Sequence, residues 1–524
     1  MKRIENKSPY VWLQRFIVLA VTILLMALPA LADTTIELDV DSGTNITNEF
    51  LYAAKQARWN SGITTIVIPK GKYTVSQLKV WGNTTVKMDG VTLTNVGERS
   101  MLRLGNKSSD FDDYNGGKGQ KGYSKEFSNI KFIGGTWNGA GKNYSIMQLG
   151  HAQNITFENV TFRNVDERHH LEFGACKNVK ILGCTFKDYA GSFSNTYNGE
   201  SIQFEVLTGV GKHHFAGYHD ITDETICRDI EIAYCTFSGL KRGIGSHTAI
   251  MNSYFSGFSI HDNVFKDITG YAISMMNYEN SSVYNNKIQN CGAGILCCTI
   301  ERSYRNMFKS AKHSNKRSTP KKLNNKIYNN ELIITRGANG ANFNNANFGI
   351  WLYGQKLRKK TGTIPKGDWR VSGVTVSGNT ITMNVDATGI LLTGSSKNTI
   401  SGNTVTCNYI KAGGNSNNGG IRVDSGNSEK IIGNTISNKK KSGRGRRMSA
   451  IIVNSGSKKI KITDNVIQSA GTDGIRLNGA SKTYILKNKI SGYGGYGIRA
   501  SKGQIKKEKG NIISGKKRKR RSWK

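Results

Sequence analysis

The stretch GESIQFEV, residues 199–206, carries side chains that could do acid–base chemistry. Glu200, Gln203 and Glu205 are interrupted by Ile202 and Phe204, and this alternation is typical of a β-strand with one buried face. Two carboxylates on such a strand could serve as the general acid and as the base or nucleophile in glycoside hydrolysis. A solvated strand face with incidental charges is the simpler alternative.

The surrounding chain repeats one phrase, in which a short alternating strand is followed by a polar turn, Gly-Ile and another strand. Examples are NITFENVTF (154–162), NVKILGCTF (178–186), DIEIAYCTF (229–237) and KITDNVI (461–467). An Asn recurs in the turn, often at intervals of 23 or 24 residues, at Asn263, Asn286, Asn330, Asn379, Asn403, Asn434, Asn465, Asn488 and Asn511. This period predicts a parallel β-solenoid with one coil per repeat. Asn suits the turn because it tolerates left-handed backbone geometry.

Alignment of the Gly-Ile strands predicts which side chains share a column along the solenoid. Residues 170–174 align with 201–205, then with 243–247 and 272–276. In this register Glu172 lies beside Gln203, and Glu205 beside His247, about 4.8 Å apart in the backbone. A second column at the corner before these strands contains His169, Glu200, Arg242 and Tyr271.

Ionisable groups of mixed type converge on the coils from 166 to 280, which also hold seven of the nine histidines. Later coils show small polar residues, Arg or a single Asp at the same places. The face between residues 166 and 280 is therefore the candidate site. The predicted catalytic residues are Glu200, Glu205, Glu172 and His247, and the predicted substrate-binding residues are Gln203, Arg242, His170, Tyr271 and Tyr218.

Insertions interrupt the coils at about 105–125, 207–226 and 304–322. The second follows Glu205 directly and contains Tyr218, and long loops that leave a strand commonly build substrate-binding walls. It also contains His213, His219, Asp220 and Asp223, which could bind a divalent metal, although their spacing matches no strong metal signature. No metal ligand is assigned, and Ca²⁺ is the one cofactor considered.

The two ends of the chain are distinct from the repeats. Residues 1–32 combine basic residues, an apolar run and Ala30-Leu31-Ala32, a pattern typical of a secretory signal peptide. Phe50, Leu51, Ala54 and Ala57 have helical spacing and follow Thr47, which predicts an N-terminal capping helix within about 44–62 with Thr47 as its N-cap. Residues 33–515 then form a single domain, and 516–524 a basic tail.

The eight cysteines lie within the repeat pattern and form no CxxC metal framework. Cys176 and Cys227 open equivalent phrases, and we expect Cys184 and Cys235 to fill the position taken by Val160 and Val264. Neighbouring pairs would lie within disulfide reach. Packing as free buried thiols is the alternative.

The run IPKGKYTVSQLKVWGNTTVKMDGVTLT (68–94), then GGTWNGAG (134–141) and then the coil phrases, resembles the pectin-lyase superfamily. The resemblance implies an all-β, right-handed parallel β-helix with an N-terminal capping helix, acting on a polysaccharide. The first two segments are most similar to polygalacturonase-type glycoside hydrolases. The catalytic signatures of that group, which are Asn-Thr-Asp, an Asp-Asp pair, Gly-His-Gly and Arg-Ile-Lys, are absent as such.

Together these features predict a secreted, monomeric enzyme that cleaves glycosidic bonds of an acidic, pectin-like polysaccharide. Hydrolysis would use carboxylates from Glu172, Glu200 and Glu205. A lyase is the runner-up: a base removes the proton beside a uronate, and Arg242 or Ca²⁺ neutralises the acid group. A non-catalytic wall- or glycan-binding protein and a carbohydrate epimerase are further alternatives. No nucleic acid partner is expected, and no membrane partner after signal cleavage.

The formal net charge of +38 predicts salt-sensitive binding of anionic polymers. Residues 1–32 contribute +3, so +35 remains after signal cleavage. Because exposed charges are screened over about 8 Å at physiological ionic strength, we expect affinity for an anionic polysaccharide to fall steeply as salt rises. Titrations over a salt series measure this, and an affinity that is flat across the series contradicts it.

Overall fold

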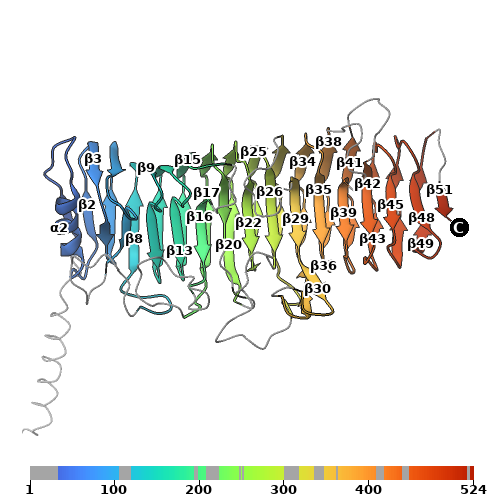
Figure 1. The fold of residues 1–524 in the computed structure, drawn as a ribbon, viewed down its shortest axis with the longest axis horizontal. Coiled ribbons are helices and arrows are strands. Elements are labelled where there is room, and N and C mark those ends of the chain that lie inside the picture. The colour runs from blue at the N-terminus through green and yellow to red at the C-terminus, as the bar shows by residue number, and fades with distance from the viewer. Residues whose placement is uncertain are drawn as a thin grey trace, which may run out of the picture.

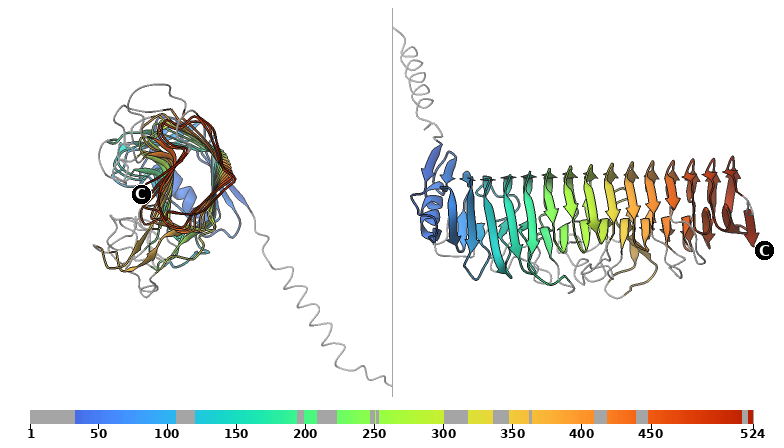
Figure 2. Two further views of the ribbon diagram at one scale, coloured as in Figure 1. Left: turned by 90° about the vertical axis from the view of Figure 1, so that its right-hand side faces the viewer. Right: turned by 90° about the horizontal axis from the view of Figure 1, so that it is seen from above.

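The computed structural model describes residues 33–105, 120–193, 199–207, 223–246, 250, 253–299, 318–335, 347–361, 364–408, 418–438 and 448–515, and the backbone of 520–523. In this part of the chain, three long parallel sheets wind into one elongated solenoid (Figure 1). Viewed along the solenoid axis, the coils superpose into one closed outline (Figure 2). This arrangement confirms the predicted fold class, a right-handed parallel β-helix.

Each coil contributes one strand to sheets A, B and C in turn. Sheet A contains β1 (Thr34–Glu37), β2 (Thr64–Val67), β5 (Thr84–Lys87), β8 (Ser128–Ile133), β11 (Gln153–Glu158), β14 (Lys177–Leu182), β17 (Arg228–Ala233), β20 (Phe255–His261), β23 (Tyr278–Glu279), β24 (Ser282–Tyr284), β27 (Lys326–Tyr328), β33 (Thr375–Ser377), β37 (Thr399–Ser401), β40 (Lys430–Ile432), β43 (Lys461–Thr463), β46 (Thr483–Leu486) and β49 (Ile505–Lys509). Sheet B contains β3 (Gly71–Val75), β6 (Val91–Asn95), β9 (Thr136–Lys142), β12 (Thr161–Val165), β15 (Thr185–Tyr189), β18 (Thr236–Ser238), β21 (Val264–Lys266), β25 (Lys287–Cys291), β28 (Glu331–Ile334), β34 (Thr380–Met383), β38 (Thr404–Cys407), β41 (Thr435–Asn438), β44 (Val466–Ile467), β47 (Lys489–Ile490) and β50 (Ile512–Ile513). Sheet C contains β4 (Leu78–Val80), β7 (Leu102–Leu104), β10 (Met147–Gly150), β13 (Leu171–Gly174), β16 (Glu200–Glu205), β19 (Arg242–Gly245), β22 (Tyr271–Met276), β26 (Ala293–Cys298), β29 (Phe348–Tyr353), β35 (Thr388–Thr393), β39 (Gly419–Asp424), β42 (Ser449–Asn454), β45 (Ile475–Asn478), β48 (Ile498–Ser501) and β51 (Arg520–Trp523).

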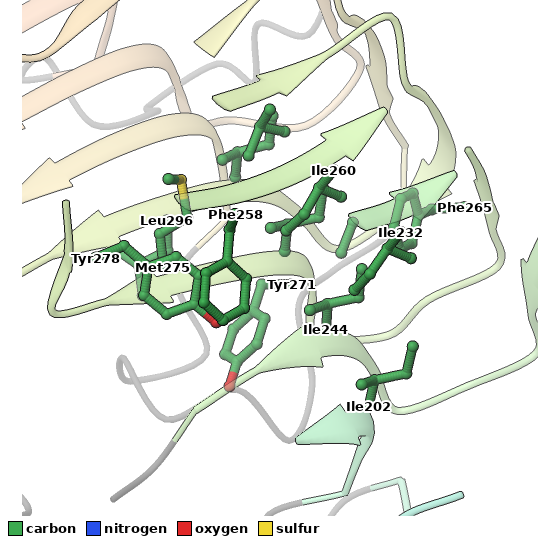
Figure 3. Packing of buried hydrophobic residues seen from close by; sticks show 14 of the residues in the cluster. Ile202, Ile232, Ile244, Phe258, Ile260, Phe265, Tyr271, Met275, Tyr278 and Leu296 are labelled. Atoms are coloured by element: carbon green, nitrogen blue, oxygen red, sulfur yellow. The ribbon is translucent and has the colours of Figure 1, made fainter. Parts of the chain in front are cut away.

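The core forms because every second residue of each strand points into the solenoid and meets its equivalent on the next coil. On sheet B, the rings of Phe162, Phe186, Phe237 and Phe265 stack in this way, with successive centroids 4.5–5.3 Å apart. Figure 3 shows Ile202 and Ile244 of sheet C packed in the same interior as residues of sheets A and B. This alternation is the property that the sequence pattern predicted.

The recurring Asn side chains form one ladder at the turn between sheets A and B. Each Asn from 263 to 488 donates its side-chain Nδ2 to Oδ1 of the Asn on the next coil, at 2.9–3.0 Å. The same Oδ1 also accepts the preceding Asn's backbone N–H, as at Asn379 and Asn403 (3.0 Å). The ladder confirms the predicted stacking of Asn379, Asn403, Asn434 and Asn465.

Toward the N-terminus, the Asn column continues as thiols. The backbone N–H of Cys235 donates to Asn263 Oδ1 at 2.9 Å, and that of Cys184 to the Cys235 sulfur. Cys235 therefore aligns with Asn263, and the predicted equivalence with Val264 was wrong by one residue. All eight cysteines are free and buried.

The helix α2 (Thr47–Ala57) lies at the N-terminal end of the solenoid (Figure 1). It buries Phe50, Ala53, Ala54 and Ala57, close to the predicted apolar stripe. Thr47 is the first helical residue and not the N-cap, since its backbone N–H donates to Asn45 Oδ1 at 3.0 Å. Protection of the open coil end by this helix stays a prediction.

Connection lengths distinguish sheet C from the other two sheets. From β8 onward, the turns between sheets A and B contain two residues, as at 134–135 and 487–488. The long connections instead leave or enter sheet C, as at 105–127, 190–199 and 206–227. One of them, after β29, carries the antiparallel pair β30 (Gln355–Leu357) and β31 (Gly367–Trp369), then β32 (Val371–Ser372), which pairs with β36 (Ser395–Ser396). Inserted chain therefore lies at both ends of the sheet C strands, which we call the two edges of sheet C.

We expect the Asn ladder to carry a large share of the local stability. Asn403→Ala removes the acceptor of two buried donors on Asn379, and each unsatisfied donor costs about 1–3 kcal/mol. The free energy of unfolding should fall by roughly 2–4 kcal/mol in urea denaturation. The control is Asn408→Ala, which removes one hydrogen bond from a half-buried amide to Asn384 (2.9 Å). This variant should lower the free energy of unfolding by about 1 kcal/mol. Equal losses in both variants would contradict a special role for the ladder.

Candidate functional site

The candidate site lies on the outer face of sheet C, on its first coils. Backbone register places Lys79 beside Arg103, Arg103 beside Gln148, Gln148 beside Glu172 and Glu172 beside Gln203. These side chains alternate with inward residues such as Leu171 and Ile202, so they share the outer face. The predicted alignment of residues 170–174 with 201–205, and of Ile202 with Ile244 and Ile273, is confirmed.

A hydrogen-bonded chain holds Glu172 in place. Its Oε2 accepts from Ser145 Oγ at 2.9 Å and from Gln148 Nε2 at 2.6 Å. Gln148 Oε1 in turn accepts from Arg103 Nε at 2.9 Å and from Ser100 Oγ at 2.8 Å. The carboxylate of Glu172, which is half-buried, is therefore fixed by side chains from two preceding coils.

Gln203 and Glu205 occupy the next coil and are covered from outside. Gln203 Nε2 donates to Glu205 Oε1, and these side chains are 0% and 6% exposed although they lie on an outer face. The chain after β16 supplies part of the cover, because a Cβ built on Gly174 would meet the Leu207 side chain at 2.7 Å. Gly174 pairs with Glu205, so Leu207 lies beside Glu205 on the same face.

The corner column contains a buried ion pair. Arg242 Nη1 lies 3.0 Å from Glu200 Oε1, and Tyr271 Oη donates to the same oxygen at 2.7 Å. Arg242 also lies over the Tyr271 ring, with its guanidinium carbon 5.3 Å from the centroid. Glu200 and Arg242 are both 0% exposed. The three residues come from successive coils and act as one buried unit.

Gly245 makes room for this buried unit. Gly245 pairs with Gln203 in the outer column, and a Cβ there would meet Glu200 Cγ at 2.8 Å and Tyr271 Oη at 3.2 Å. The Glu200 side chain therefore crosses from the corner onto the outer face. Strict alternation ends at the corner and could not predict where the Glu200 side chain points. The contact above Gly245 shows that it points onto the outer face.

Two further groups border the buried unit. His169 Nδ1 lies 2.7 Å from the Glu200 carbonyl oxygen and 4.0 Å from Glu200 Oε2. Burial, and then the positive charge of Arg242, lower the pKa of Lys241 to about 8, against the opposing effect of Glu167 and Glu200. Lys241 is the residue that sequence reasoning missed here, because it precedes the aligned strand and carries no periodic signal.

The prediction that His170 faces the substrate was wrong. His170 is 1% exposed, packs edge-on against Phe186 in the core, and lies 2.9 Å from Ser201 Oγ through Nδ1. Burial lowers its pKa to about 3, so the ring is neutral at physiological pH. At this corner the side chains point inward. Gly243, which occupies the position of His170 two coils later, shows the same direction, because a Cβ there would meet the Phe265 ring.

Several predicted groups lie outside the described residues, including His247, Tyr218, His213, His219 and Asp220. Asp223 is described, and its carboxylate accepts from the backbone N–H of Gly122 at 2.7 Å and of Thr225 at 3.0 Å. The bond from Gly122 ties the connection after β16 to the connection after β7. Within the described ranges, no three His, Cys, Asp or Glu side chains form a metal-binding group.

Sequence reasoning also missed Arg103 and Gln148, which extend the polar column toward the N-terminus. Their signal was present, because both alternate with apolar residues in LRL (102–104) and MQLG (147–150). The recurring coil phrase begins only near residue 130, and the alignment of strands started at residue 170. Extending it backward by two coils would have included both side chains.

Three parallel sheets wound into one solenoid define a parallel β-helix, the fold that the sequence resemblance implied. No protein-family model and no curated protein sequence matches the chain. Among solved structures, it is similar to the surface adhesin PfbA of Streptococcus pneumoniae, at 16% identity and a TM-score of 0.43, over 89% of this chain and 93% of that one.

Two further similarities are to a mannuronan C-5 epimerase and a phage tailspike. The A-module of AlgE6 from Azotobacter vinelandii matches at 12% identity and a TM-score of 0.40, over 90% of this chain and 97% of that one. The tailspike of E. coli bacteriophage HK620, in complex with a pentasaccharide, matches at 11% identity and a TM-score of 0.45, over 90% and 76%. In the described part of this chain, none of the helical segments has the length and apolar character that a membrane crossing requires.

Glu200→Gln should destabilise the protein strongly, because it leaves Arg242 charged and buried without its counter-ion. We expect the free energy of unfolding to fall by about 3–5 kcal/mol in urea denaturation. The matched control is Glu158→Gln, which breaks the half-exposed pair with Lys131 and costs about 1 kcal/mol or less. Adding Arg242→Met to Glu200→Gln should restore part of the loss. Similar losses for Glu200→Gln and Glu158→Gln would show that Arg242 is not held by this pair.

Proposed function

We propose that the protein is a secreted enzyme that hydrolyses glycosidic bonds of an acidic polysaccharide, with Glu172 and Glu205 as the catalytic carboxylates. The observation that carries the proposal is their shared position. Both lie on the outer face of sheet C on adjacent coils, with Gln203 between them, where inserted chain flanks both edges. A floor of carboxylates between walls is the arrangement that a glycan-cleaving cleft needs.

The spacing of Glu172 and Glu205 suits hydrolysis. Glu172 pairs with Gln203, so Glu205 lies one coil further and two residues along the strand. Strand geometry then separates their Cα atoms by about 8 Å. Paired carboxyl groups in glycosidases are about 5–5.5 Å apart in retaining enzymes and about 6.5–9.5 Å apart in inverting ones, and side chains from such Cα positions reach either range.

We assign a positioning role to Glu200 and Arg242, in place of the catalytic and substrate-binding roles expected from sequence. Both are fully buried, and the Glu200 carboxylate is already engaged by Arg242 and Tyr271, whereas Glu172 is half-buried and Glu205 accepts from the uncharged Gln203. The pair instead holds Tyr271 and the strand end of β16, from which Gln203 and Glu205 project. His247 and Tyr218 stay candidates for catalysis and substrate binding.

Charge favours an acidic substrate. The chain keeps +35 after removal of residues 1–32, and Lys79 and Arg103 belong to the same outer column as Glu172. Positive charge on and beneath this face attracts a polyanion over a distance and raises its local concentration. The same feature suits the alternative of β-elimination, so the test must separate the two reactions.

The test is a panel of plant, algal and host polysaccharides, with two readouts for each. Hydrolysis produces new reducing ends without ultraviolet absorbance, whereas β-elimination produces an unsaturated, ultraviolet-absorbing end. Cleavage with absorbance would replace hydrolysis by lyase chemistry at this site. Binding without any turnover across the panel would leave a glycan-binding protein.

On a cleaved substrate, Glu172→Gln and Glu205→Gln should each lower kcat by about a hundredfold or more, the usual size of general acid–base contributions. The control is Asp424→Asn, which removes a carboxylate from the outer face of sheet C on a later coil, where it pairs with Arg422 at 2.7 Å. Its kcat should stay near that of the wild type. Unfolding transitions of all three variants check that they fold. Full activity of both Glu variants, or an equal loss in Asp424→Asn, would place the site elsewhere.

A further inference from the structure

A second polar hollow lies on later coils, away from the carboxylates. Its volume is about 700 Å³, within the range of ligand-binding pockets. One wall is the hairpin of β30 and β31, which projects from the edge of sheet C (Figure 1). The other is the series of turns that follow β35, β39 and β42. The hollow is thus built by four coils together.

Cations dominate the described lining. Lys356, Arg358 and Arg370 come from the hairpin segment, and Lys458 and Lys459 from the turn after β42. No Asp or Glu is among the lining residues that the structure describes. The nearest acid of the hairpin, Asp368, is held by Arg370, whose Nε donates to Asp368 Oδ1 at 2.7 Å. Five positive charges therefore face one space whose described lining includes no carboxylate.

The turns on the other wall repeat their charge at the coil spacing. Lys397, Ser428, Lys459 and Lys482 have φ between 53° and 61° and occupy equivalent turn positions on successive coils. Backbone N–H groups connect them in order, from Lys397 to the Asn427 carbonyl, then Ser428 to Lys458 and Lys459 to Ser481. All three lysines of this set are exposed. Lysines one or two coils apart, about 4.8 Å per coil, form a row that continues past the hollow.

The hairpin is anchored rather than loosely attached. Trp369 is fully buried, its Nε1 donates to the Pro365 carbonyl at 2.9 Å, and its own carbonyl accepts from Thr299 Oγ1 at 2.5 Å. At its base, a Cβ on Gly394 would collide with Gly354 O, so the hairpin lies directly against the next coil. The cations of the two walls therefore face each other across a preformed space, which reduces the ordering cost of binding.

The remaining lining is compatible with a glycan as the ligand. It offers hydroxyl and amide groups from Gln355, Thr393, Ser425 and Asn427, which suit a polyhydroxylated partner. Binding of single-stranded nucleic acid relies on exposed aromatic platforms, and Tyr353, the aromatic residue in the described lining, is 8% exposed. A membrane surface would need protruding apolar groups, whereas Leu357 is half-buried within a concave site.

We infer that this basic hollow, together with the lysine row beside it, is an anchoring site for an anionic polysaccharide, separate from the cleft at Glu172 and Glu205. It binds acid groups that repeat along a glycan, either carboxylates or sulfates. The inference takes only the class of ligand, a polysaccharide, from the proposed function. A polymer held here would be kept close to sheet C without being cleaved.

The test compares the full-length secreted protein with Lys458→Gln/Lys459→Gln. Dextran sulfate and polygalacturonate are the anionic probes, and dextran shares the glucan backbone of dextran sulfate without its charge. We expect the variant to bind at least one anionic probe at least tenfold more weakly than the wild type, and dextran to bind neither protein. The probe that loses more affinity identifies the preferred acid group.

The matched control is Lys266→Gln/Lys489→Gln, which removes the same charge from exposed positions on sheet B, away from the lysine row. It should change affinity by less than about threefold, since long-range screening weakens distant charges. Equal losses in both double variants would overturn the inference in favour of diffuse charge. Single-stranded DNA that binds as tightly as the glycans, and is lost in the same variant, would overturn it in favour of a nucleic acid site.

Failure of this inference can be distinguished from failure of the proposed function. Glu205→Gln leaves the hollow intact, so its affinity for dextran sulfate should equal that of the wild type whether or not Glu205 is catalytic. Conversely, Lys458→Gln/Lys459→Gln should keep its turnover of short oligosaccharides and lose efficiency on the polymer. A drop in dextran sulfate affinity in Glu205→Gln as large as that in the lysine variant would show that the anionic probe binds at the cleft and not in the hollow.

Discussion

Backbone pairing between successive coils is the constraint on which every other feature depends. Because each strand is hydrogen-bonded in parallel to its equivalent one coil later, a side chain meets the residue at the same position about 4.8 Å away. The stacked Phe residues of sheet B, the Asn ladder and the column from Lys79 to Gln203 are all results of that single rule. Groups distant in the sequence become neighbours without any specific long-range design. A charged or polar side chain therefore belongs to a column of equivalent side chains on successive coils.

This rule explains why much of the fold and part of the site could be predicted from the sequence. The spacing of the Asn and of the Gly-Ile strands is sufficient to set the register, so the pairing of Glu172 with Gln203 followed directly. It also placed Glu200, Arg242 and Tyr271 in one column, which their contacts at 2.7–3.0 Å reproduce. Periodicity carries this information because the coils are nearly identical where the core is built.

Other properties of the site depend on chain that has no period. Alternation ends at a corner, so it could not show that His170 turns into the core, although its equivalents Ser201, Gly243 and Ala272 are small and signal a crowded position. The burial of Glu200 arises from side chains crossing the space above Gly245, which depends on the absence of a Cβ there. The basic hollow requires an inserted hairpin to meet the turns of later coils. Such contacts between unlike segments leave no repeat to recognise.

The turns between sheets A and B have a constant length of two residues from β8 onward, whereas the connections on either side of sheet C vary in length. On the coils from Asn286 to Asn488, each turn carries an Asn bonded to its neighbours on both sides, so an added residue would break hydrogen bonds on two coils at once. The borders of sheet C hold connections as different as 277 alone and 206–227. Changes in chain length are thereby channelled to the borders of one face. Ligand preference in this architecture can diversify by lengthening or exchanging those borders, while the pitch of the coils, and with it the resistance of the scaffold to unfolding, is inherited unchanged.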